Sequence, residues 1–403
     1  EVTDKAYGPW VLRHDSWTPD GLRALARAAG ELRYRPRFSI VMPVYDTPER
    51  WLREAIDSVA GQAYDNWELC ICDDNSAASH VPAVLDAYSR ADSRIKVVRR
   101  AQNGHIARAT NDAMSLMTGE FMCLLDHDDA LAPDALFEFA KLLNEDSEID
   151  LLYSDEDLIS IDDVRYEPII KPAWSPENLE SYMYIGHLAC YRADHARRIG
   201  GFRADYRRSP PTRADAAKNI RHVAKILYHW RAVPGSVAVS IEKKDYVVDA
   251  ARRSLEQRLL RTGDTGSVVE RSVKGWFDVR RAVIGGPLVA VIVAALSPQD
   301  AHDSSGTDQA AACIESIRSR TTYRKYEVIV AKATCNGTDS LSEAAAQANG
   351  DYLVFMDEGA RIISDDWLQS MLRYAQRPGV GAVGAKLLFE DDTMRHAGIV
   401  FSE

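Results

Sequence analysis

The sequence predicts an α/β fold in which parallel strands alternate with helices, and three neighbouring segments carry this prediction. Residues 38–45 form an apolar run typical of a buried strand. Residues 47–62 place apolar side chains three and four positions apart, as one face of a helix requires. Residues 66–76, "NWELCICDDNS", form a second buried strand that ends in acids. A strand, a helix and a strand at this spacing form a βαβ unit, and open sheets of this kind bind ligands at the carboxyl ends of their strands.

Turn and cap residues mark where the predicted helices begin. Thr18 is expected to cap an N-terminal helix that has Pro19 in its first turn. Thr47 and Pro48 are expected to begin the helix of the βαβ unit in the same way. Later in the chain, the stretch up to about residue 238 is expected to be irregular and rich in aromatics, and residues 245–262 to be helical.

Two later strands also end in acids. Residues 121–134, "FMCLLDHDDALAPD", run from an apolar strand into three aspartates within four positions, and residues 149–160 end in a second acidic group. Burying carboxylates is costly unless they are paired or coordinate a metal. Because Asp126 and Asp128 are two apart, an extended segment projects both to one face, where they can hold Mg²⁺ or Mn²⁺. The alternative is a helix N-cap cluster in which Asp129 precedes "PDALFEF".

The composition indicates a globular protein of two domains or one large one. The 403 residues are 46% hydrophobic and 27% charged. The net charge of -11 argues against a general nucleic-acid binder but permits an anionic ligand held by arginines or a metal. The 6 cysteines lack zinc or disulfide spacing, which favours a reducing, cytoplasmic location. No signal peptide is visible, and "PLVAVIVAAL" from Pro287 is expected to be a core strand because it is too short to span a membrane.

The chain contains an internal repeat that keeps the apolar residues of the strands. "LVAVIVAALSP" from Leu288 matches the first strand, "YRKYEVIVAKATC" from Tyr323 the second, and "GDYLVFMDEGARIISDDWL" from Gly350 the strand at 121–134. The second copy is shorter between its second and third segments, which predicts that a helix or strand is missing.

The acids of the first copy are not repeated in the same way. Lys332 and Ala333 replace Asp73 and Asp74, and Gly359 replaces Asp128, whereas Asp126 is matched by Asp357. A copy that keeps the strands should also keep acids that serve folding, so we assign the chemistry to the first copy. The predicted organisation is a helical extension (1–36), an α/β domain (37–240), a helical linker (241–286) and a degenerate copy (287–403).

The ordered motifs resemble family 2 glycosyltransferases of the inverting, GT-A-fold type. They are "SIVMPVYDTPERWLREAIDSV", "WELCICDDNS", "NGHIARATNDA" and "FMCLLDHDDAL". "KPAWSPENL", "YIGHLACYR" and "YHWRAVPGSVA" further resemble a tandem-domain bacterial subgroup associated with O-antigen and other surface polysaccharides. The resemblance implies a Rossmann-like mixed sheet flanked by helices, followed by a shortened GT-A-like repeat.

The resemblance also implies an activity and its partners. We expect transfer of a sugar from a nucleotide-diphosphate donor, of the UDP or dTDP type, to a glycan or lipid-linked acceptor. A divalent cation, Mn²⁺ or Mg²⁺, would neutralise the departing diphosphate. The expected location is the cytoplasm, with peripheral association with the inner membrane or with assembly partners allowed.

The motif positions carry the family's roles onto named residues. Alternatives from the residues alone stay open: a turn for the acids at 73–74, a solvated helix arginine at 108 and a polar strand end at 154–157. The expected donor-binding residues are Pro43, Val44, Tyr45, Asp73, Asp74, Asn103, Gly104, Arg108 and Asp126; the metal ligands are Asp126 and Asp128; the acceptor side is formed by Asp155, Glu156 and Asp157.

The general base is the point at which this sequence departs from the family. The family carries an acidic motif soon after its "GGF" turn, but here Gly200, Gly201 and Phe202 are followed by a shortened, basic stretch. Asp205 is the nearest match, and an ordinary surface acid is the alternative. A second hypothesis is therefore a catalytically impaired nucleotide-sugar-binding or scaffold protein of a polysaccharide assembly complex. A third, a nucleotidyltransferase, would carry a glycine-rich loop that "PVYDTPERW" lacks.

Overall fold

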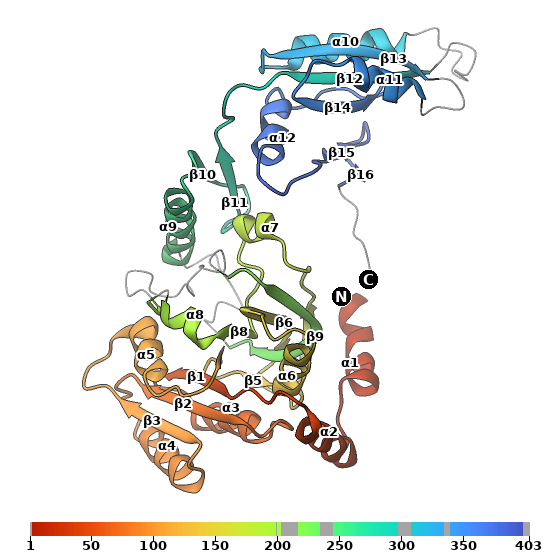
Figure 1. Ribbon diagram of the computed structural model, residues 1–403. Coiled ribbons are helices and arrows are strands. Elements are labelled where there is room, and N and C mark those ends of the chain that lie inside the picture. The colour runs from red at the N-terminus through yellow and green to blue at the C-terminus, as the bar shows by residue number, and fades with distance from the viewer. Residues whose placement is uncertain are drawn as a thin grey trace. The chain divides into compact units, whose positions relative to one another are not determined.

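A computed structural model describes residues 2–198, 200–202, 217–233, 245–296, 308–333 and 339–397. The chain divides into two compact units, whose helices and strands are labelled in Figure 1. Unit 1 comprises residues 1–258 and 268–279, and unit 2 comprises residues 259–267 and 280–403.

Unit 1 alternates strands and helices as the sequence predicts. The first βαβ unit consists of β1 (Phe38–Val44), α3 (Glu49–Ala60) and β2 (Trp67–Asp73). The other helices before β9 are α1 (Val2–His14), α2 (Pro19–Glu31), α4 (His80–Ala91), α5 (His105–Met114), α6 (Ala135–Glu145), α7 (Pro176–Ser181) and α8 (Ala193–Arg198). The other strands are β3 (Ile95–Arg99), β4 (Phe121–Leu124), β5 (Ala130–Leu131), β6 (Leu151–Ile159), β7 (Arg165–Ile169), β8 (Ala189–Arg192) and β9 (Ile220–Arg231).

One mixed sheet organises unit 1. Its strand order is β3-β2-β1-β4-β8-β6-β9-β5, and β7 pairs with β6. Strands β3, β2, β1 and β4 are parallel, whereas β8 runs antiparallel to both β4 and β6. The predicted mixed sheet is therefore confirmed. The register pairs Val44 with Asp73 and Val41 with Leu124, so β1, β2 and β4 end at one edge.

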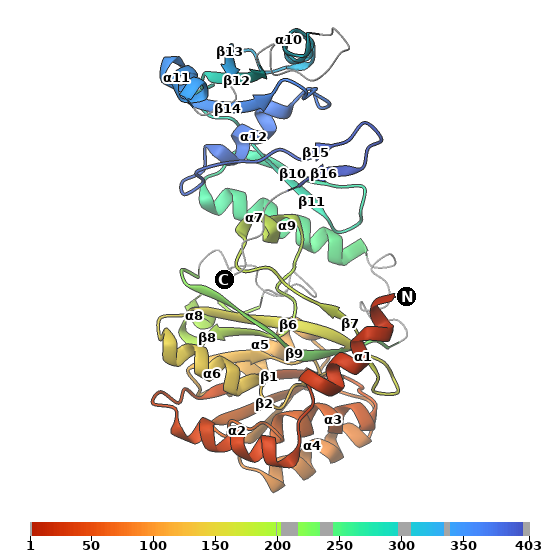
Figure 2. The same cartoon turned by 90° about the vertical axis from the view of Figure 1, so that its right-hand side faces the viewer.

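Helices cover both faces of this sheet and bury its apolar side chains (Figures 1 and 2). One core cluster joins β1, β2 and β4 to α3, α4 and α6, and its centre includes Phe38, Leu52 and Phe139. The other cluster joins the opposite face to α5 and α8 through residues such as Met122 and Tyr191. Full burial of each large apolar side chain contributes about 1.5–3 kcal/mol to the free energy of unfolding. Within the described ranges, no helix is both long and apolar enough to cross a membrane.

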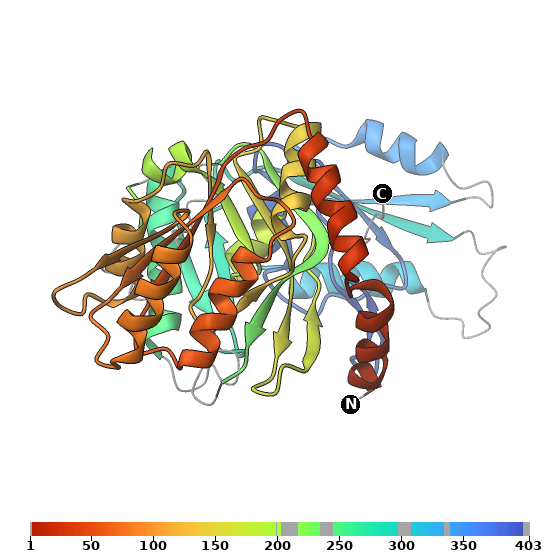
Figure 3. The ribbon, with the colours of Figure 1, turned by 90° about the horizontal axis from the view of Figure 1, so that it is seen from below.

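The two predicted helix caps had different outcomes. Thr18 caps α2 as predicted, because its hydroxyl accepts a hydrogen bond from the backbone N–H of Gly21 at 3.1 Å. The prediction for Thr47 is wrong: Pro48 occupies the cap position of α3, and the buried Thr47 hydroxyl has no partner in the described part of the chain. Figure 3 shows α1 and α2 following one another along one side of unit 1.

The prediction that the stretch up to residue 238 is irregular is also wrong. It contains β7, α7, β8, α8 and the 12-residue strand β9. β9 pairs in parallel with β6, more than 60 residues earlier, and in antiparallel with β5. It is followed in the chain by α9 (Asp245–Thr262) and by a two-stranded sheet of β10 (Gly266–Glu270) and β11 (Phe277–Arg281). The stretch predicted as a helical linker thus contains strands as well as its helix.

Unit 2 is built on three parallel strands in the order β13-β12-β14. Among its described residues, nothing corresponds to α4 and β3, as the shortened repeat predicts. Its elements after β11 are β12 (Val289–Leu296), α10 (Gln309–Arg320), β13 (Tyr326–Ala333), α11 (Asp339–Gln347), β14 (Tyr352–Asp357), α12 (Trp367–Ala375), β15 (Leu387–Leu388) and β16 (Met394–His396).

The strand register relates the two copies residue by residue. Phe38 pairs with Trp67 and Phe121 in unit 1, and Val289 pairs with Tyr326 and Tyr352 in unit 2. This register aligns residue 73 with 332 and residue 126 with 357. The alignment of the repeat made from the sequence is therefore confirmed.

Two acids keep the same hydrogen bond in both copies. Glu68 accepts from the backbone N–H of Thr118, and its counterpart Glu327 accepts from that of Asn349. Likewise Glu120 accepts from the N–H of Arg37, and its counterpart Asp351 from that of Leu288. These two scaffold acids are thus retained, whereas Asp73, Asp74 and Asp128 are not.

Glu68 is the most extensively hydrogen-bonded of these scaffold acids. It is fully buried in β2 and also accepts hydrogen bonds from Ser39 at 2.6 Å and from Lys96 at 2.7 Å. Burial alone would raise the pKa of Glu68, but the hydrogen bonds from Lys96, Ser39 and Thr118 lower it to about 2. The ionised carboxylate therefore stabilises the folded state.

We expect Glu68→Gln to lower the free energy of unfolding by about 3 kcal/mol at pH 7. Because the folded pKa lies below the unfolded value, this stabilisation is complete above about pH 4.5 and is lost as the pH falls towards 2. Urea denaturation of the two proteins at pH 7 and pH 3 measures the difference. Glu145→Gln, at an exposed position on α6, is the control. An equal difference at both pH values would contradict this assignment.

Candidate active site

The ends of β1, β2 and β4 bring the predicted donor-binding segments together. Pro43 and Val44 are buried within β1, and Tyr45, just beyond it, is 47% exposed. The backbone N–H of Leu125 bonds the carbonyl of Val41 at 3.1 Å, which carries the acids after β4 to the same edge. Of the first three predicted residues, Tyr45 is thus the one with its side chain open to a ligand.

Asp73 and Asp74 are both buried, and both hold loops in place. Oδ1 of Asp73 accepts from the backbone N–H of Ser76 at 2.9 Å, which is the turn considered as the alternative from sequence. Oδ1 of Asp74 accepts from the N–H of Gly104 at 2.8 Å and pairs with Arg100 at 2.9 Å. Oδ2 of Asp73 has no hydrogen bond in the described part of the chain, so this oxygen is available to a ligand.

Asp46 is a structural residue of this edge that the sequence did not reveal. Its Oδ1 accepts from the backbone N–H groups of Ala77 and Ala78 at 2.7 and 2.9 Å. Its own N–H donates to Ser76 Oγ at 3.0 Å. The loop after β1 and the loop after β2 are therefore tied together beside Asp73. The only sequence signal was an aspartate before a Thr-Pro pair, which does not specify a partner.

The loop before α5 presents the remaining predicted donor contacts. Gly104 lies against Arg100, because a Cβ atom at Gly104 would stand 2.7 Å from Nη2 of that arginine. Asn103 accepts from the N–H of His105 at 3.1 Å and is otherwise exposed. Arg108 is exposed on α5 and has no ion pair among the described residues, so its guanidinium is open to an anion.

The three aspartates after β4 differ sharply in their surroundings. Asp126 and Asp128 have side chains that are 43% and 23% exposed, whereas Asp129 is buried. Burial raises the pKa of Asp128, and the charge of Asp126 raises it further against the opposing effect of His127. Burial, followed by the charges of Asp128 and Asp126, raises the pKa of Asp129 well above its ordinary value. The ionised forms of Asp128 and Asp129 are therefore disfavoured, mainly by burial and also by the neighbouring carboxylates.

Asp129 serves the fold. Its carboxylate accepts from the hydroxyl of Tyr228 at 2.5 Å and from the backbone N–H of Arg231 at 2.7 Å, both on β9. It does not cap a helix, since α6 begins at Ala135 with Asp134 in the cap position. The N-cap alternative for Asp129 is therefore wrong.

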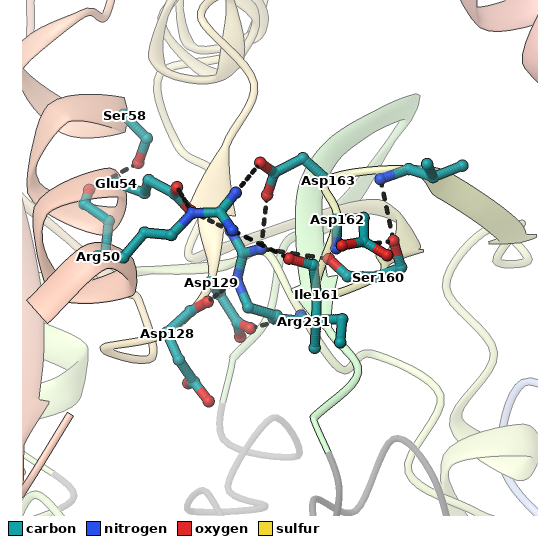
Figure 4. Close-up of polar contacts among 12 residues, drawn as sticks. Arg50, Glu54, Ser58, Asp128, Asp129, Ser160, Ile161, Asp162, Asp163 and Arg231 are labelled. Carbon is teal, nitrogen blue, oxygen red and sulfur yellow. Dashed lines mark hydrogen bonds and ion pairs between the residues drawn. The ribbon is translucent and has the colours of Figure 1, made fainter. Parts of the chain in front are cut away.

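The buried guanidinium of Arg231 holds the main chain of Asp128 in place (Figure 4). Its Nε donates to the main-chain carbonyl of Asp128 at 2.7 Å. Its other nitrogens bond Asp163 at 2.7 Å, Glu54 at 2.8 Å and the carbonyl of Ser160 at 3.3 Å. One side chain thus fixes the backbone of the acidic loop to α3 and to the turn after β6.

The carboxylates of Asp126 and Asp128 fit a cation that substrate oxygens help to hold. Within the described ranges, no three His, Cys, Asp or Glu side chains are grouped to hold a metal by themselves. Mg²⁺ typically binds through one or two carboxylates together with phosphates and water. Two partly exposed carboxylates with a raised pKa at Asp128 match that requirement, because a cation would relieve their repulsion.

The acids predicted for the acceptor side are buried in β6 and bonded internally. Asp155 accepts from the N–H of Lys171 and lies 2.8 Å from a ring nitrogen of His222. Asp157 bonds His229 at 2.6 Å and also Tyr7 and Arg165. Their acceptor role stays a prediction. Glu156 is the one connected to Asp126, through His187, whose ring lies between them.

His187 is the site residue that reasoning from the sequence missed. The motif "YIGHLACYR" was singled out only as part of a resemblance. A histidine that directly follows a glycine at the start of an apolar strand was the available signal. The candidate base Asp205 lies outside the described residues, so its role also stays a prediction.

A mixed α/β sheet that begins with parallel strands and is flanked by helices is the GT-A type of glycosyltransferase fold. The chain belongs to glycosyl transferase family 2, whose profile matches residues 39–200 and 301–397. The two matched ranges fall in the two copies of the repeat, which confirms that both derive from one kind of domain.

Two similar proteins are much longer than this chain. The uncharacterized protein y4gI of Sinorhizobium fredii is 35% identical over 94% of this chain and 45% of its own length. The O-antigen biosynthesis protein RfbC of Myxococcus xanthus is 32% identical over 98% of this chain and 32% of its own length. The chain thus spans less than half of either relative. A crystal structure of S. aureus TarS with UDP superposes with a TM-score of 0.45 at 18% identity, covering 56% of this chain and 65% of TarS.

Proposed function

We propose that this chain is a metal-dependent inverting glycosyltransferase. It moves a sugar from a nucleotide-diphosphate donor to a glycan or lipid-linked acceptor in surface polysaccharide synthesis. The observation that carries the proposal is the contrast among the three aspartates after β4. Asp129 is buried and structural, whereas Asp126 and Asp128 are partly exposed at the edge of the sheet where β1 and β2 also end. Two neighbouring carboxylates repel each other, so their partial exposure at the ligand-binding edge of the sheet supports a role in holding a cation.

The nucleotide part of the donor has candidate partners at this edge. The free Oδ2 of Asp73 and the exposed ring of Tyr45 suit a uracil or thymine base, whose ring N–H needs an acceptor. The open guanidinium of Arg108 suits a phosphate or ribose oxygen. Asp128 and Asp126 would hold Mn²⁺ or Mg²⁺, which supplies the positive charge that stabilises the leaving diphosphate.

The biological setting of the proposal comes from the relatives and the cysteines. The printed name of RfbC places that protein in O-antigen biosynthesis. The five described cysteines are free and buried, which supports a reducing, cytoplasmic location. Peripheral association with the inner membrane or with assembly partners belongs to this proposal, since the acceptor of such an enzyme can be lipid-linked.

The second candidate function is a nucleotide-sugar-binding or scaffold protein without turnover. The observation that favours it is the shortened, basic stretch after Phe202, where Asp205 is the nearest match to a general base. The two candidates differ in one assay: release of UDP from UDP-sugars, with and without glycan acceptors. If the wild type turns over and Asp205→Asn does not, the chain is an enzyme and Asp205 is its general base. Donor binding without turnover would establish the scaffold.

We expect one molecule of UDP or dTDP to bind per chain in the presence of Mn²⁺, and none at the second copy. In unit 2, Lys332 and Gly359 replace Asp73 and Asp128, and the remaining Asp357 bonds the backbone N–H of Gly359 at 2.8 Å. Titration calorimetry on the full chain gives the stoichiometry. Two equivalent sites per chain would contradict the assignment of chemistry to the first copy, and no binding at all would contradict the proposed function.

A further inference from the structure

The ring of His187 faces Asp126 without touching it. Nε2 of the imidazole lies 4.0 Å from Oδ2 of Asp126, which is too long for a direct hydrogen bond. The His187 side chain is 26% exposed, so a ligand can reach it. No role assigned so far to the site uses this histidine.

The other ring nitrogen is firmly held. Nδ1 of His187 lies 3.0 Å from Oε2 of Glu156, and the same oxygen accepts from the His187 backbone N–H at 2.8 Å. The ammonium of Lys171 lies 3.7 Å from Glu156 and donates to the carbonyls of Ile185 and His187. At Gly186 a Cβ atom would stand 2.6 Å from Glu156, so only glycine allows this carboxylate to reach the imidazole. The orientation of the ring is therefore fixed from one side.

Aromatic residues on β9 fix the ring from its face. His187 stacks on Tyr228 with ring centroids 4.6 Å apart, and it also contacts Trp230 at 5.4 Å. The hydroxyl of Tyr228 accepts from the backbone N–H of Asp126 at 3.1 Å. One tyrosine therefore sets the position of both Asp126 and His187, and it aims Nε2 at the Asp126 carboxylate.

The gap between the two groups selects a hydroxyl as the ligand. An oxygen placed between them can lie about 2.8 Å from both Nε2 and Oδ2. The Asp126 carboxylate accepts hydrogen bonds only, so it would repel a phosphate oxygen and favour a hydroxyl. A hydroxyl can also donate to a neutral Nε2 or accept from a protonated one, so the contact forms in either state of the ring.

Electrostatics supports this arrangement. Burial alone would lower the pKa of His187, but the hydrogen bond with Glu156 and the charges of Glu156, Asp126 and Asp129 raise it to about 9. An imidazolium would strengthen the hydrogen bond to a hydroxyl oxygen.

We propose that His187 and Asp126 bind one hydroxyl of the donor sugar between them. This inference rests on the proposed function and adds to it the residue that recognises the sugar. Oδ1 of Asp126 remains available to the cation. Glu156 and Tyr228 act as positioning residues, since they hold His187 and touch no substrate in this account.

The test separates the sugar from the nucleotide. Affinities of UDP, UDP-glucose, UDP-galactose and UDP-N-acetylglucosamine are measured by calorimetry with Mn²⁺ for the full chain and for His187→Ala. We expect the variant to bind UDP as the wild type does, and to lose roughly tenfold in affinity for the preferred UDP-sugar. His187→Gln, which retains more of the packing, repeats the test if the alanine variant is poorly folded. His195→Gln, at a buried histidine on α8, is the control.

Deoxy analogues of the preferred UDP-sugar identify the hydroxyl on the wild-type protein. Removal of the bound hydroxyl is expected to cost the wild type at least roughly tenfold in affinity, and to cost His187→Ala less, because only the contact with Asp126 is then left to lose. An unchanged ratio of UDP-sugar to UDP affinity in His187→Ala would overturn the inference while leaving the proposed function intact, as would a wild type that gains nothing from any sugar. A wild type that binds neither UDP nor dTDP would overturn both.

Discussion

Replacing Asp128 with alanine is expected to abolish the Mn²⁺-dependent part of UDP binding and to leave the fold intact. The loss should be about 100-fold or more, since removal of a ligand costs at least as much as removal of the groups that support one. The fold should survive because Arg231 bonds the main-chain carbonyl of Asp128, which alanine retains. The carboxylate itself is raised in pKa by burial and by Asp126, so its removal also relieves repulsion.

Calorimetry with Mn²⁺ and with EDTA measures this effect, and thermal unfolding reports on the fold. We expect the melting temperature of Asp128→Ala to be unchanged or slightly higher. Glu145→Ala, which removes an exposed carboxylate on α6, should keep wild-type UDP binding. Equal UDP affinity with and without Mn²⁺ in the wild type would contradict the metal assignment.

Replacing Arg231 with methionine is expected to lower the free energy of unfolding by about 1–3 kcal/mol, because buried carbonyl groups lose their hydrogen-bond donor. Arg231 is 2% exposed and donates hydrogen bonds to the main-chain carbonyls of Asp128 and Ser160, as well as pairing with the partly exposed Glu54 and Asp163. The Asp128 carbonyl would also lose its donor, so affinity for UDP with Mn²⁺ should fall as well. Urea denaturation measures the first effect and calorimetry the second.

Arg50 is a matched control for Arg231. It pairs with the same two acids, Glu54 and Asp163, but its side chain is 55% exposed (Figure 4). Solvent screens such pairs, so Arg50→Met should cost less than about 1 kcal/mol and leave UDP binding unchanged. Equal losses of stability in the two variants would show that Arg231 does not act through its buried contacts.

The parts of the fold that could be predicted are those that local patterns specify. Apolar runs followed by acids located β1, β2 and β4, and the helical spacing of Leu52, Ile56 and Val59 located α3. β9 could not be predicted in the same way, because polar residues alternate irregularly along it and its pairing with β6 is set by tertiary contacts. The roles of Thr47 and Asp129 depended on which backbone group stood nearby, which the sequence does not specify.

For the candidate site too, the sequence revealed what local patterns specify and missed what tertiary contacts specify. The acidic cluster could be located because carboxylates at the end of an apolar strand are unusual, and the repeat showed which of these acids the second copy lacks. The reasoning from the repeat holds for the retained pairs Glu68 with Glu327 and Glu120 with Asp351, since each keeps its hydrogen bond. It does not hold for Asp129, which serves the fold but is replaced by Ala360 in the second copy. His187 could not be found, because the groups that aim it, Glu156 and Tyr228, come from β6 and β9.

The central claim is that Asp126 and Asp128 hold a cation against the diphosphate of a nucleotide sugar. A crystal structure of the full chain with UDP and Mn²⁺, with the anomalous signal of manganese recorded, tests it most directly. The account predicts a manganese peak within coordination distance of the Asp128 carboxylate and of the diphosphate, with the uracil ring of UDP beside Asp73. A nucleotide bound elsewhere, with Asp126 and Asp128 contacting only protein atoms, would contradict it.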